Sequence, residues 1–92
     1  MNKSQLIEAL AQEINLPLRE ASPITDTILD TMVEALTAGD SIEIRGFGSF
    51  VVKEYDSYVG RNPKTGDSIK VPSKKLPFFK VGKDLKEKVN KT

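Results

Sequence analysis

The sequence predicts an α+β protein with an N-terminal helical hairpin, a three-stranded antiparallel sheet, a long protruding β-ribbon arm and a short C-terminal helix. Up to Leu36, apolar residues recur at three- and four-residue steps, which is typical of helices. From Ser41 they alternate with polar residues, as in strands, and residues 60–66 are dense in turn formers. A single domain over 1–92 is expected, because the chain has only 92 residues.

The first helix is expected to begin after Asn2, which can cap it, with Gln5 at the spacing of a capping box. Its apolar residues share one face: Leu6, Ile7, Leu10 and Ile14. Asn15-Leu16-Pro17 is expected to end this helix.

The second helix has two possible starts. Ser22-Pro23 has the form of a cap followed by a first-turn proline. Alternatively, Leu18 to Ala21 form an earlier turn that the proline only kinks. The apolar stripe is clear in either case: Ile24, Ile28, Met32, Ala35 and Leu36. Gly39 is expected to close the helix as its C-terminal cap.

Strands are expected in the second half of the chain. Apolar and polar residues alternate from Ser41 to Arg45, which predicts a first strand, and residues 46–48 are expected to form a turn. Ser49 to Val59 is expected to form a longer strand, and Ser68 to Val71 a strand that runs back along it. Prolines confine the segment after Val71 to a sheet edge or an irregular run.

The chain is then expected to return to the core at Phe78-Phe79. Gly82 leads into a short helix from about Lys83 to Val89.

The hairpin over about 53–75 is read as the arm. Its large apolar groups are few: Tyr55, Tyr58, Val59, Ile69 and Val71. A lone two-stranded ribbon is marginal in water, so the arm is expected to order fully against a partner.

The composition removes the residues that many enzymes and metal sites use. The chain contains neither Cys nor His, so the usual zinc ligands and the commonest general base are missing. An enzyme, a cofactor and a small-molecule substrate are therefore not expected. No apolar stretch is long enough for a signal peptide or a membrane span, and a cytoplasmic protein is the expectation.

Charge is distributed unevenly along the chain. Residues 1–40 hold two basic and seven acidic groups, a net charge of −5, whereas the remainder carries +6. This asymmetry indicates one end or face for a polyanion, although a solvated surface of mixed charge is the alternative.

The arm tip places Asn62-Pro63 between Arg61 and Lys64. Architectural DNA proteins insert such apolar wedges between base steps. An ordinary turn uses the same residue types, so this motif alone does not distinguish a DNA-inserting wedge from a surface turn.

Arg45 lies at a predicted turn, from which its side chain can reach outward. Arginine suits narrow, strongly negative minor grooves. A surface ion pair with Glu43 or a helix carboxylate is the alternative. Phe47 and Phe50, beside it, are read as core residues and not as base-stacking groups.

A basic series follows the arm's return and the last helix: Lys70, Lys74, Lys75, Lys80, Lys83, Lys86, Lys88 and Lys91. Such point charges suit phosphates, which position a protein without carrying sequence information. Lys3, at the start of the first helix, can join them. A solvated basic face is the alternative.

Three motifs together resemble those of a known family: Gly46-Phe47-Gly48-Ser49-Phe50, the turn Gly60-Arg61-Asn62-Pro63-Lys64-Thr65-Gly66, and Pro77-x-Phe79-Lys80-x-Gly82-Lys83. Over the whole chain, in this order and spacing, they are similar to the bacterial HU/IHF family of histone-like, nucleoid-associated proteins that bend and condense DNA. The resemblance implies an intertwined dimer, with helices over a saddle of sheet and two arms that track the minor groove of double-stranded DNA. The wedge-and-bend mechanism is known of this family, and only the resemblance implies it for this chain.

The resemblance implies a DNA-binding role for each residue of this chain that matches a position of the family motifs. Pro63 corresponds to the intercalating wedge, with Arg61, Asn62 and Lys64 beside it in the groove. Candidates for phosphate contacts along the body and lower arm are Lys3, Lys74, Lys75, Lys80, Lys83 and Lys86.

The Arg45-Gly46 pair and the stretch from Arg61 to Asp67 are more similar to the IHF β-type subunit than to HU. In that subunit the matching arginine helps to recognise the site through the minor groove.

The upper arm departs from the family. Tyr55 and Tyr58, among Lys53, Glu54 and Asp56, stand where relatives usually have arginines. This predicts weaker or more salt-sensitive binding, or a different arm path. The tyrosines can instead make cross-strand pairs that stiffen the ribbon.

Three alternatives stay open on the sequence alone. A homodimer is expected, and a heterodimer with a related subunit uses similar faces. Binding can be general or site-specific. An adaptor whose hairpin augments a partner's sheet is the alternative from another class, although lysines and prolines along the arm oppose strand pairing.

Overall fold

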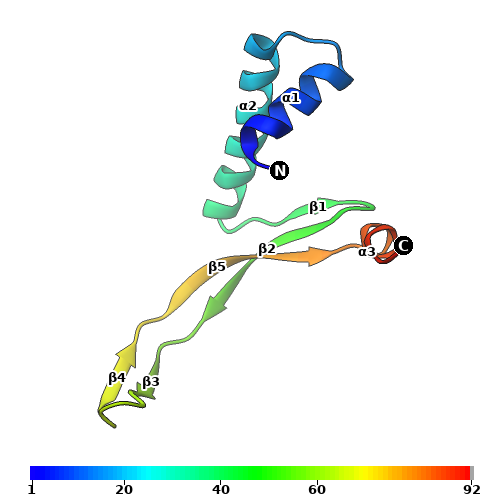
Figure 1. Ribbon diagram of the computed structural model, residues 1–92. Helices are drawn as coiled ribbons and strands as arrows, with labels where there is room; N and C mark the ends of the chain where they lie inside the picture. Colours follow the sequence, from blue (N-terminus) through cyan, green and yellow to red (C-terminus); the bar gives the residue numbers. More distant parts are fainter. Residues whose placement is uncertain (92) are drawn as a thin grey trace. The chain divides into compact units, whose positions relative to one another are not determined.

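The computed structural model describes residues 1–91 and confirms the α+β class, with three helices and antiparallel strands (Figure 1). The elements are α1 (Lys3–Glu13), α2 (Leu18–Thr37), β1 (Ile42–Ile44), β2 (Gly48–Tyr55), β3 (Tyr58–Arg61), β4 (Ser68–Val71), β5 (Lys74–Val81) and α3 (Lys83–Asn90). They form two compact units, one over Met1–Ala35 and one that begins at Leu36.

Both ends of α1 are closed as predicted. The Gln5 N–H donates to the Asn2 side chain at 2.9 Å, and the Asn2 N–H donates to the Gln5 side chain at 2.9 Å. At the other end Asn15 adopts a positive φ of 56°, and the Leu16 N–H donates to the Ala11 carbonyl at 2.9 Å. This arrangement is a Schellman motif with asparagine in the left-handed position.

Helix α2 begins at Leu18, so the start at Ser22-Pro23 is wrong and the earlier turn is confirmed. The Ala21 N–H donates to the Pro17 carbonyl at 3.0 Å, which closes the first turn. Pro23 lies inside the helix, where it removes one backbone donor and the helix continues. Gly39, with φ of 83°, follows the last turn and confirms the predicted C-terminal cap.

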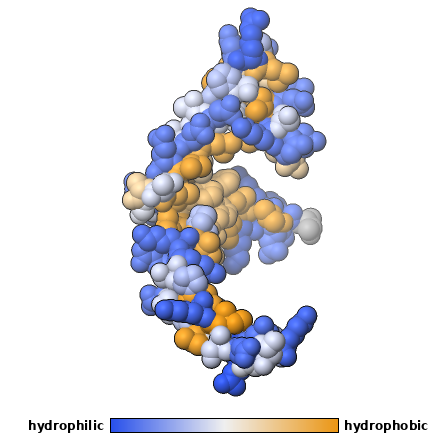
Figure 2. Space-filling view, turned by 90° about the vertical axis from the view of Figure 1, so that its left-hand side faces the viewer, coloured by the Kyte–Doolittle hydropathy of each residue, from blue (hydrophilic) through white to orange (hydrophobic). Residues whose placement is uncertain are grey.

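The helical unit buries only small side chains. Ala11, Ala21 and Thr25 are buried, and the Thr25 hydroxyl donates to the Ala21 carbonyl at 3.0 Å. In contrast, Ile28 is 53% and Val33 is 60% exposed. Apolar side chains of α2 therefore lie at the surface of the single chain, and Figure 2 shows exposed apolar residues on the face that it presents.

The sheet has the strand order β1-β2-β5, with antiparallel pairs throughout. Neighbouring residues of a strand point to opposite faces, and residues directly opposite on paired strands share a face. One face is therefore apolar: Ile42, Ile44, Phe50, Val52, Phe79 and Val81. On this face the Phe79 ring lies 4.8 Å from Phe50 and 5.4 Å from Phe47. The aromatic cluster is incomplete, since Phe79 remains 37% exposed.

The ribbon formed by β3 and β4 is a separate two-stranded sheet. The predicted strand from Ser49 to Val59 is interrupted, because β2 ends at Tyr55 and β3 begins at Tyr58. The pair Tyr55–Lys74 closes the inner ladder and the pair Tyr58–Val71 opens the outer one. Pro72, which has no N–H, lies in the opposing gap and cannot donate to the ladder. Each strand advances three residues across the gap, so the two ladders have the same pairing register.

Glycine is required where the β1–β2 turn meets the end of β5. A Cβ on Gly48 would lie 2.5 Å from the Lys80 carbonyl oxygen and 2.7 Å from the Phe79 ring. The Gly82 N–H donates to the Phe47 carbonyl at 2.9 Å beside it. The turn can therefore approach β5 this closely only because no side chain intervenes.

We expect Gly48→Ala to lower the free energy of unfolding by more than Gly39→Ala does. Gly39 has a positive φ but open space around it, so alanine there should cost about 1–2 kcal/mol of backbone strain. Alanine at position 48 adds direct overlap with backbone. Urea unfolding followed by circular dichroism, at one fixed protein concentration, measures both, and equal losses would contradict the close approach.

Candidate nucleic-acid interface

The tip of the ribbon is a loop over 62–67 that Asn62 closes. The Asn62 N–H donates to the Asp67 carbonyl at 2.9 Å, and the Gly66 N–H donates to the Asn62 carbonyl at 2.7 Å. The Asn62 side chain also accepts the Lys64 N–H at 2.9 Å. Gly66 takes the positive φ of 75° that the loop needs. Pro63 follows Asn62 directly and is exposed, so it is presented on a loop held on both sides.

Cations flank this proline. Arg61 ends β3, Lys64 follows Pro63, and both are exposed. Asn62 is half-buried, as expected for a residue that makes three hydrogen bonds. Arg61, Pro63 and Lys64 are therefore exposed together at the tip of the ribbon.

The register separates the side chains of the ribbon into two faces. One face carries the cations Lys53 and Lys74 on the inner ladder and Arg61 and Lys70 on the outer one, which together we call the cationic face. The other carries Glu54 and Lys75 on the inner ladder and Tyr58, Ile69 and Val71 on the outer one, which together we call the opposite face. Asp56 lies in the gap between the ladders, two residues after Glu54, and is counted with it. Lys74 and Lys75, which the basic series of the sequence does not distinguish, thus point to different sides.

Contacts agree with this assignment. The Lys53 ammonium lies 3.5 Å from the centroid of the Phe78 ring, and that of Lys74 lies 5.9 Å from Tyr55. On the other side, Lys75 Nζ lies 3.3 Å from Glu54 Oε1. The tyrosines do not face each other, since Tyr55 pairs with Lys74 and Tyr58 pairs with Val71.

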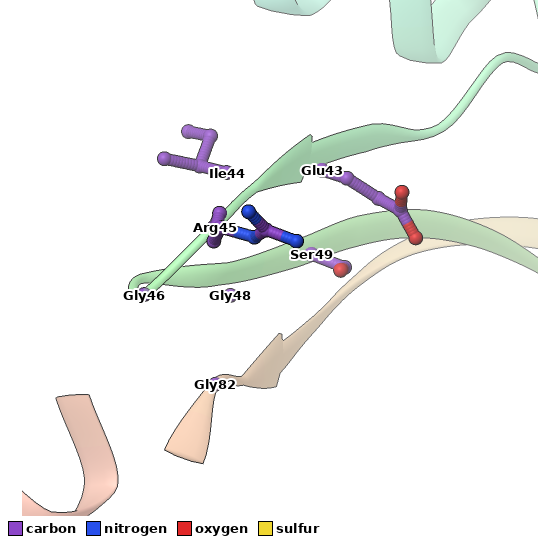
Figure 3. A pocket seen from close by; sticks show the side chains of 7 residues that line it. All are labelled: Glu43, Ile44, Arg45, Gly46, Gly48, Ser49 and Gly82. Carbon is purple, nitrogen blue, oxygen red and sulfur yellow. The ribbon is translucent and has the colours of Figure 1, made fainter. Parts of the chain in front are cut away.

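Arg45 lies at the second position of the turn from Ile44 to Phe47. The Phe47 N–H donates to the Ile44 carbonyl at 3.0 Å, and Gly46 has φ of 84°, which fits the third position of a type II turn. The guanidinium points toward Ser49, on the side from which Glu43 also projects, while Ile44 projects away (Figure 3).

These side chains line a shallow hollow with Gly46, Gly48 and Gly82. The two ion pairs found within 1–91 are Lys3–Asp26 and Lys75–Glu54, so Arg45 has no carboxylate partner in this part of the chain.

Three further candidate lysines lie near the end of β5 and in α3. Lys80 is opposite Ser49 and shares the face of the sheet that carries Glu43. Lys83 and Lys86 are exposed, three residues apart at the start of α3. A spacing of three places them on one side of that helix.

Lys3 belongs to the helical unit and is already paired. Its Nζ lies 2.6 Å from Asp26 Oδ1, and the side chains are 59% and 44% exposed. The hydrogen bond to Asp26, and then the charges of Asp26 and Asp30, raise the pKa of Lys3 above its ordinary value of 10.5. Any phosphate contact by Lys3 would compete with this pair.

Two residues of this region were missed from the sequence. Lys53 joins Lys74 on the cationic face, and Glu43 lines the hollow beside Arg45. The alternation of Glu43 and Arg45 along one strand was a usable signal. For Lys53 the signal was absent, because its face depends on the register with β5.

The described residues offer neither a metal cluster nor a membrane-spanning helix. Within 1–91 no three acidic side chains gather as metal ligands would. None of the helices in this range has the length and apolar composition of a membrane span.

Comparisons with known proteins agree with one another. A family model described as bacterial DNA-binding protein matches residues 1–90. Integration host factor subunit beta of Cupriavidus metallidurans is 52% identical over 93 residues, covering 100% of this chain and 69% of that protein. DNA-binding protein HU-beta of Pseudomonas aeruginosa is 47% identical over 90 residues, covering 98% and 100%.

Solved structures are similar over the same length. An Anabaena HU–DNA cocrystal structure matches with a TM-score of 0.88 and 36% identity, covering 100% of both chains. HU from Thermotoga maritima matches with a TM-score of 0.69 and 37% identity, covering 97% of this chain and 98% of that one.

The Lys3–Asp26 pair yields a direct test. Asp26→Asn removes the hydrogen-bonding carboxylate, so the pKa of Lys3 should fall toward its ordinary value. A pH titration of the lysine side chain by heteronuclear NMR measures this. Asp30→Asn is the matched control and should lower it less, since Asp30 acts only at longer range. An unchanged pKa in Asp26→Asn would show that the pair does not form in solution.

Proposed function

Because the chain belongs to the family of bacterial DNA-binding proteins that includes HU and integration host factor, we propose that it is an architectural protein that bends double-stranded DNA. It does so as one half of a dimer whose ribbons enter the minor groove. It associates with the nucleoid in the cytoplasm, and its 92 residues act as one DNA-binding domain.

The observation that carries this proposal is the construction of the tip. Pro63 is exposed on a loop that Asn62 closes with three hydrogen bonds, and cations stand on both sides. In minor-groove proteins, among which HU and IHF are counted, an apolar wedge between base steps costs a few kcal/mol of stacking and kinks the duplex. A rigid proline loop suits this role, since little conformational freedom is lost when it inserts.

The proposed DNA contacts divide by role. Pro63 is the wedge, with Arg61, Asn62 and Lys64 beside it in the groove. Arg45 enters a narrow stretch of the minor groove, which its freedom from carboxylates within the described residues supports. The proposed phosphate contacts are Lys3, Lys70, Lys74, Lys80, Lys83 and Lys86. Lys75, the remaining candidate from the sequence, is paired with Glu54 and is left out of this set.

Exposed apolar surface supports the dimer. Ile28 on α2 and Phe79 on the apolar face of the sheet are 53% and 37% exposed, although both belong to segments with core-like patterns. The buried hydrophobic residues of the described chain are Ala11 and Ala21 alone. A second copy, or a related subunit, would cover this surface and gain about 25 cal/mol for each Å² removed from water.

Binding should weaken steeply with salt. Each phosphate contact contributes about 0.9 to the slope of log affinity against log salt concentration, because counterions are released. A gel-shift titration of a duplex at several salt concentrations measures the slope. Absence of any complex at low salt would end the DNA-binding proposal.

Pro63→Ala should reduce the bend and leave the dimer intact. Without the wedge, intact DNA keeps its stacking, so the bend measured by fluorescence energy transfer between duplex ends should fall. Affinity for a nicked duplex should change little, because the nick has already removed the stacking cost. An unchanged bend on intact DNA would remove Pro63 from the mechanism.

The purified protein alone should have the mass of a dimer. Sedimentation or light scattering, repeated with a short duplex at two salt concentrations, should show one dimer for each duplex at low salt. A stable monomer at micromolar concentration would contradict the proposed assembly.

A further inference from the structure

Adjacent residues of the arm carry opposite chemistry because of the pairing register. Lys74 is opposite Tyr55, and Lys75 is opposite Glu54. Neighbours along a strand point to opposite sides of it, so these two lysines lie on different faces of one ribbon. The composition of each face can therefore be considered by itself.

The paired residues of the cationic face include no carboxylate. Its charges come from both segments of the ribbon: Lys53 and Lys74 on the inner ladder, Arg61 and Lys70 on the outer one. Lys53 and Lys74 lie over the rings of Phe78 and Tyr55, at 3.5 and 5.9 Å. Neutral rings hold these ammonium groups in place without cancelling their charge, which leaves them available to phosphates.

The opposite face carries acidic as well as basic side chains. Lys75 is paired with Glu54 at 3.3 Å, and both side chains are 71% exposed. Asp56, in the gap between the two ladders, adds a second exposed acid. The uncharged groups here are Tyr58, Ile69 and Val71.

We propose that the arm binds DNA through the cationic face alone, and that Glu54 and Asp56 keep a second duplex off the opposite face. This deepens the function proposed above and rests on it. The protein then bends one duplex without bridging two.

Because salt screens charges, the cationic face can attract one duplex while the acids on the opposite face repel a second. The acids and the cations project from opposite sides of the ribbon. Exposed charges farther apart than the Debye length of about 8 Å at physiological salt are largely screened, so acids directed away from a bound duplex act weakly on it. A second duplex on the opposite face would meet the two carboxylates directly, where like charges repel. The sequence predicts weaker DNA binding because of the acids in the upper arm. Their placement on the opposite face makes this loss of affinity smaller.

The adjacent lysines provide a matched test. Lys74→Gln should lower the slope of log affinity against log salt by about 0.9 for each arm, because one phosphate contact is lost. Lys75→Gln makes the same charge change one residue away and should leave the slope unchanged. Lys74→Arg should restore it. Gel-shift titrations measure all three, and Lys70→Gln provides a second variant on the cationic face.

Bridging is tested with two duplexes. A biotinylated duplex on beads is loaded with protein at low salt and washed, and a second, fluorescent duplex is added. The unmodified protein should capture none of it. The double variant Glu54→Lys, Asp56→Lys should capture it. The control Glu8→Lys, Glu13→Lys makes the same change in net charge on α1 and should not.

The outcomes are distinguishable. Equal loss of slope in Lys74→Gln and Lys75→Gln, capture by the unmodified protein, or equal capture by the two double variants would each overturn the one-sided arm. Absence of binding to any duplex by the unmodified protein would instead overturn the proposed function.

Discussion

The antiparallel register of β2 against β5, continued by β3 against β4, is the constraint on which the sheet and the ribbon depend. It assigns every side chain to one of two faces. Phe50 and Phe79 thereby meet on the apolar face of the sheet, while Lys53 and Lys74 gather on one side of the arm. A slip of one residue would exchange the faces along a whole strand and separate Phe50 from Phe79.

The β1–β2 turn and the end of β5 hold a second set of groups in place. Gly48 allows the turn to lie against β5, and the hydrogen bond from Gly82 to Phe47 ties the start of α3 to it. Arg45 extends from this turn, and Lys83 follows Gly82 directly. One close backbone contact therefore positions cations that are far apart in the chain. The tip achieves the same end locally, because Asn62 alone closes the loop that presents Pro63.

Thin burial connects the fold to the proposed assembly. Small chains bury a modest fraction of their surface, and here Ile28, Val33 and Phe79 remain exposed in the single chain. The interrupted ribbon of the arm also needs contacts with another molecule, since two-stranded ribbons are marginally stable in water. A partner subunit for the apolar surface and a duplex for the ribbon each supply the missing contacts. Stability and DNA binding are therefore expected to be coupled through mass action.

Local sequence signals determined the helix caps at Asn2 and Gly39, a turn within 60–66 and the change from helical to strand periodicity. Each of these depends on residues three or four positions apart or on one backbone angle, and the structure confirms them. The loop itself spans 62–67, because Gly60 and Arg61 belong to β3. Tertiary pairing decided the rest: the break after Tyr55, the different faces of Lys74 and Lys75, and the engagement of Lys3 by Asp26. These features depend on what lies opposite a residue in space. Alternation along one strand divides its residues into two faces, but only the partner strand shows which face is cationic.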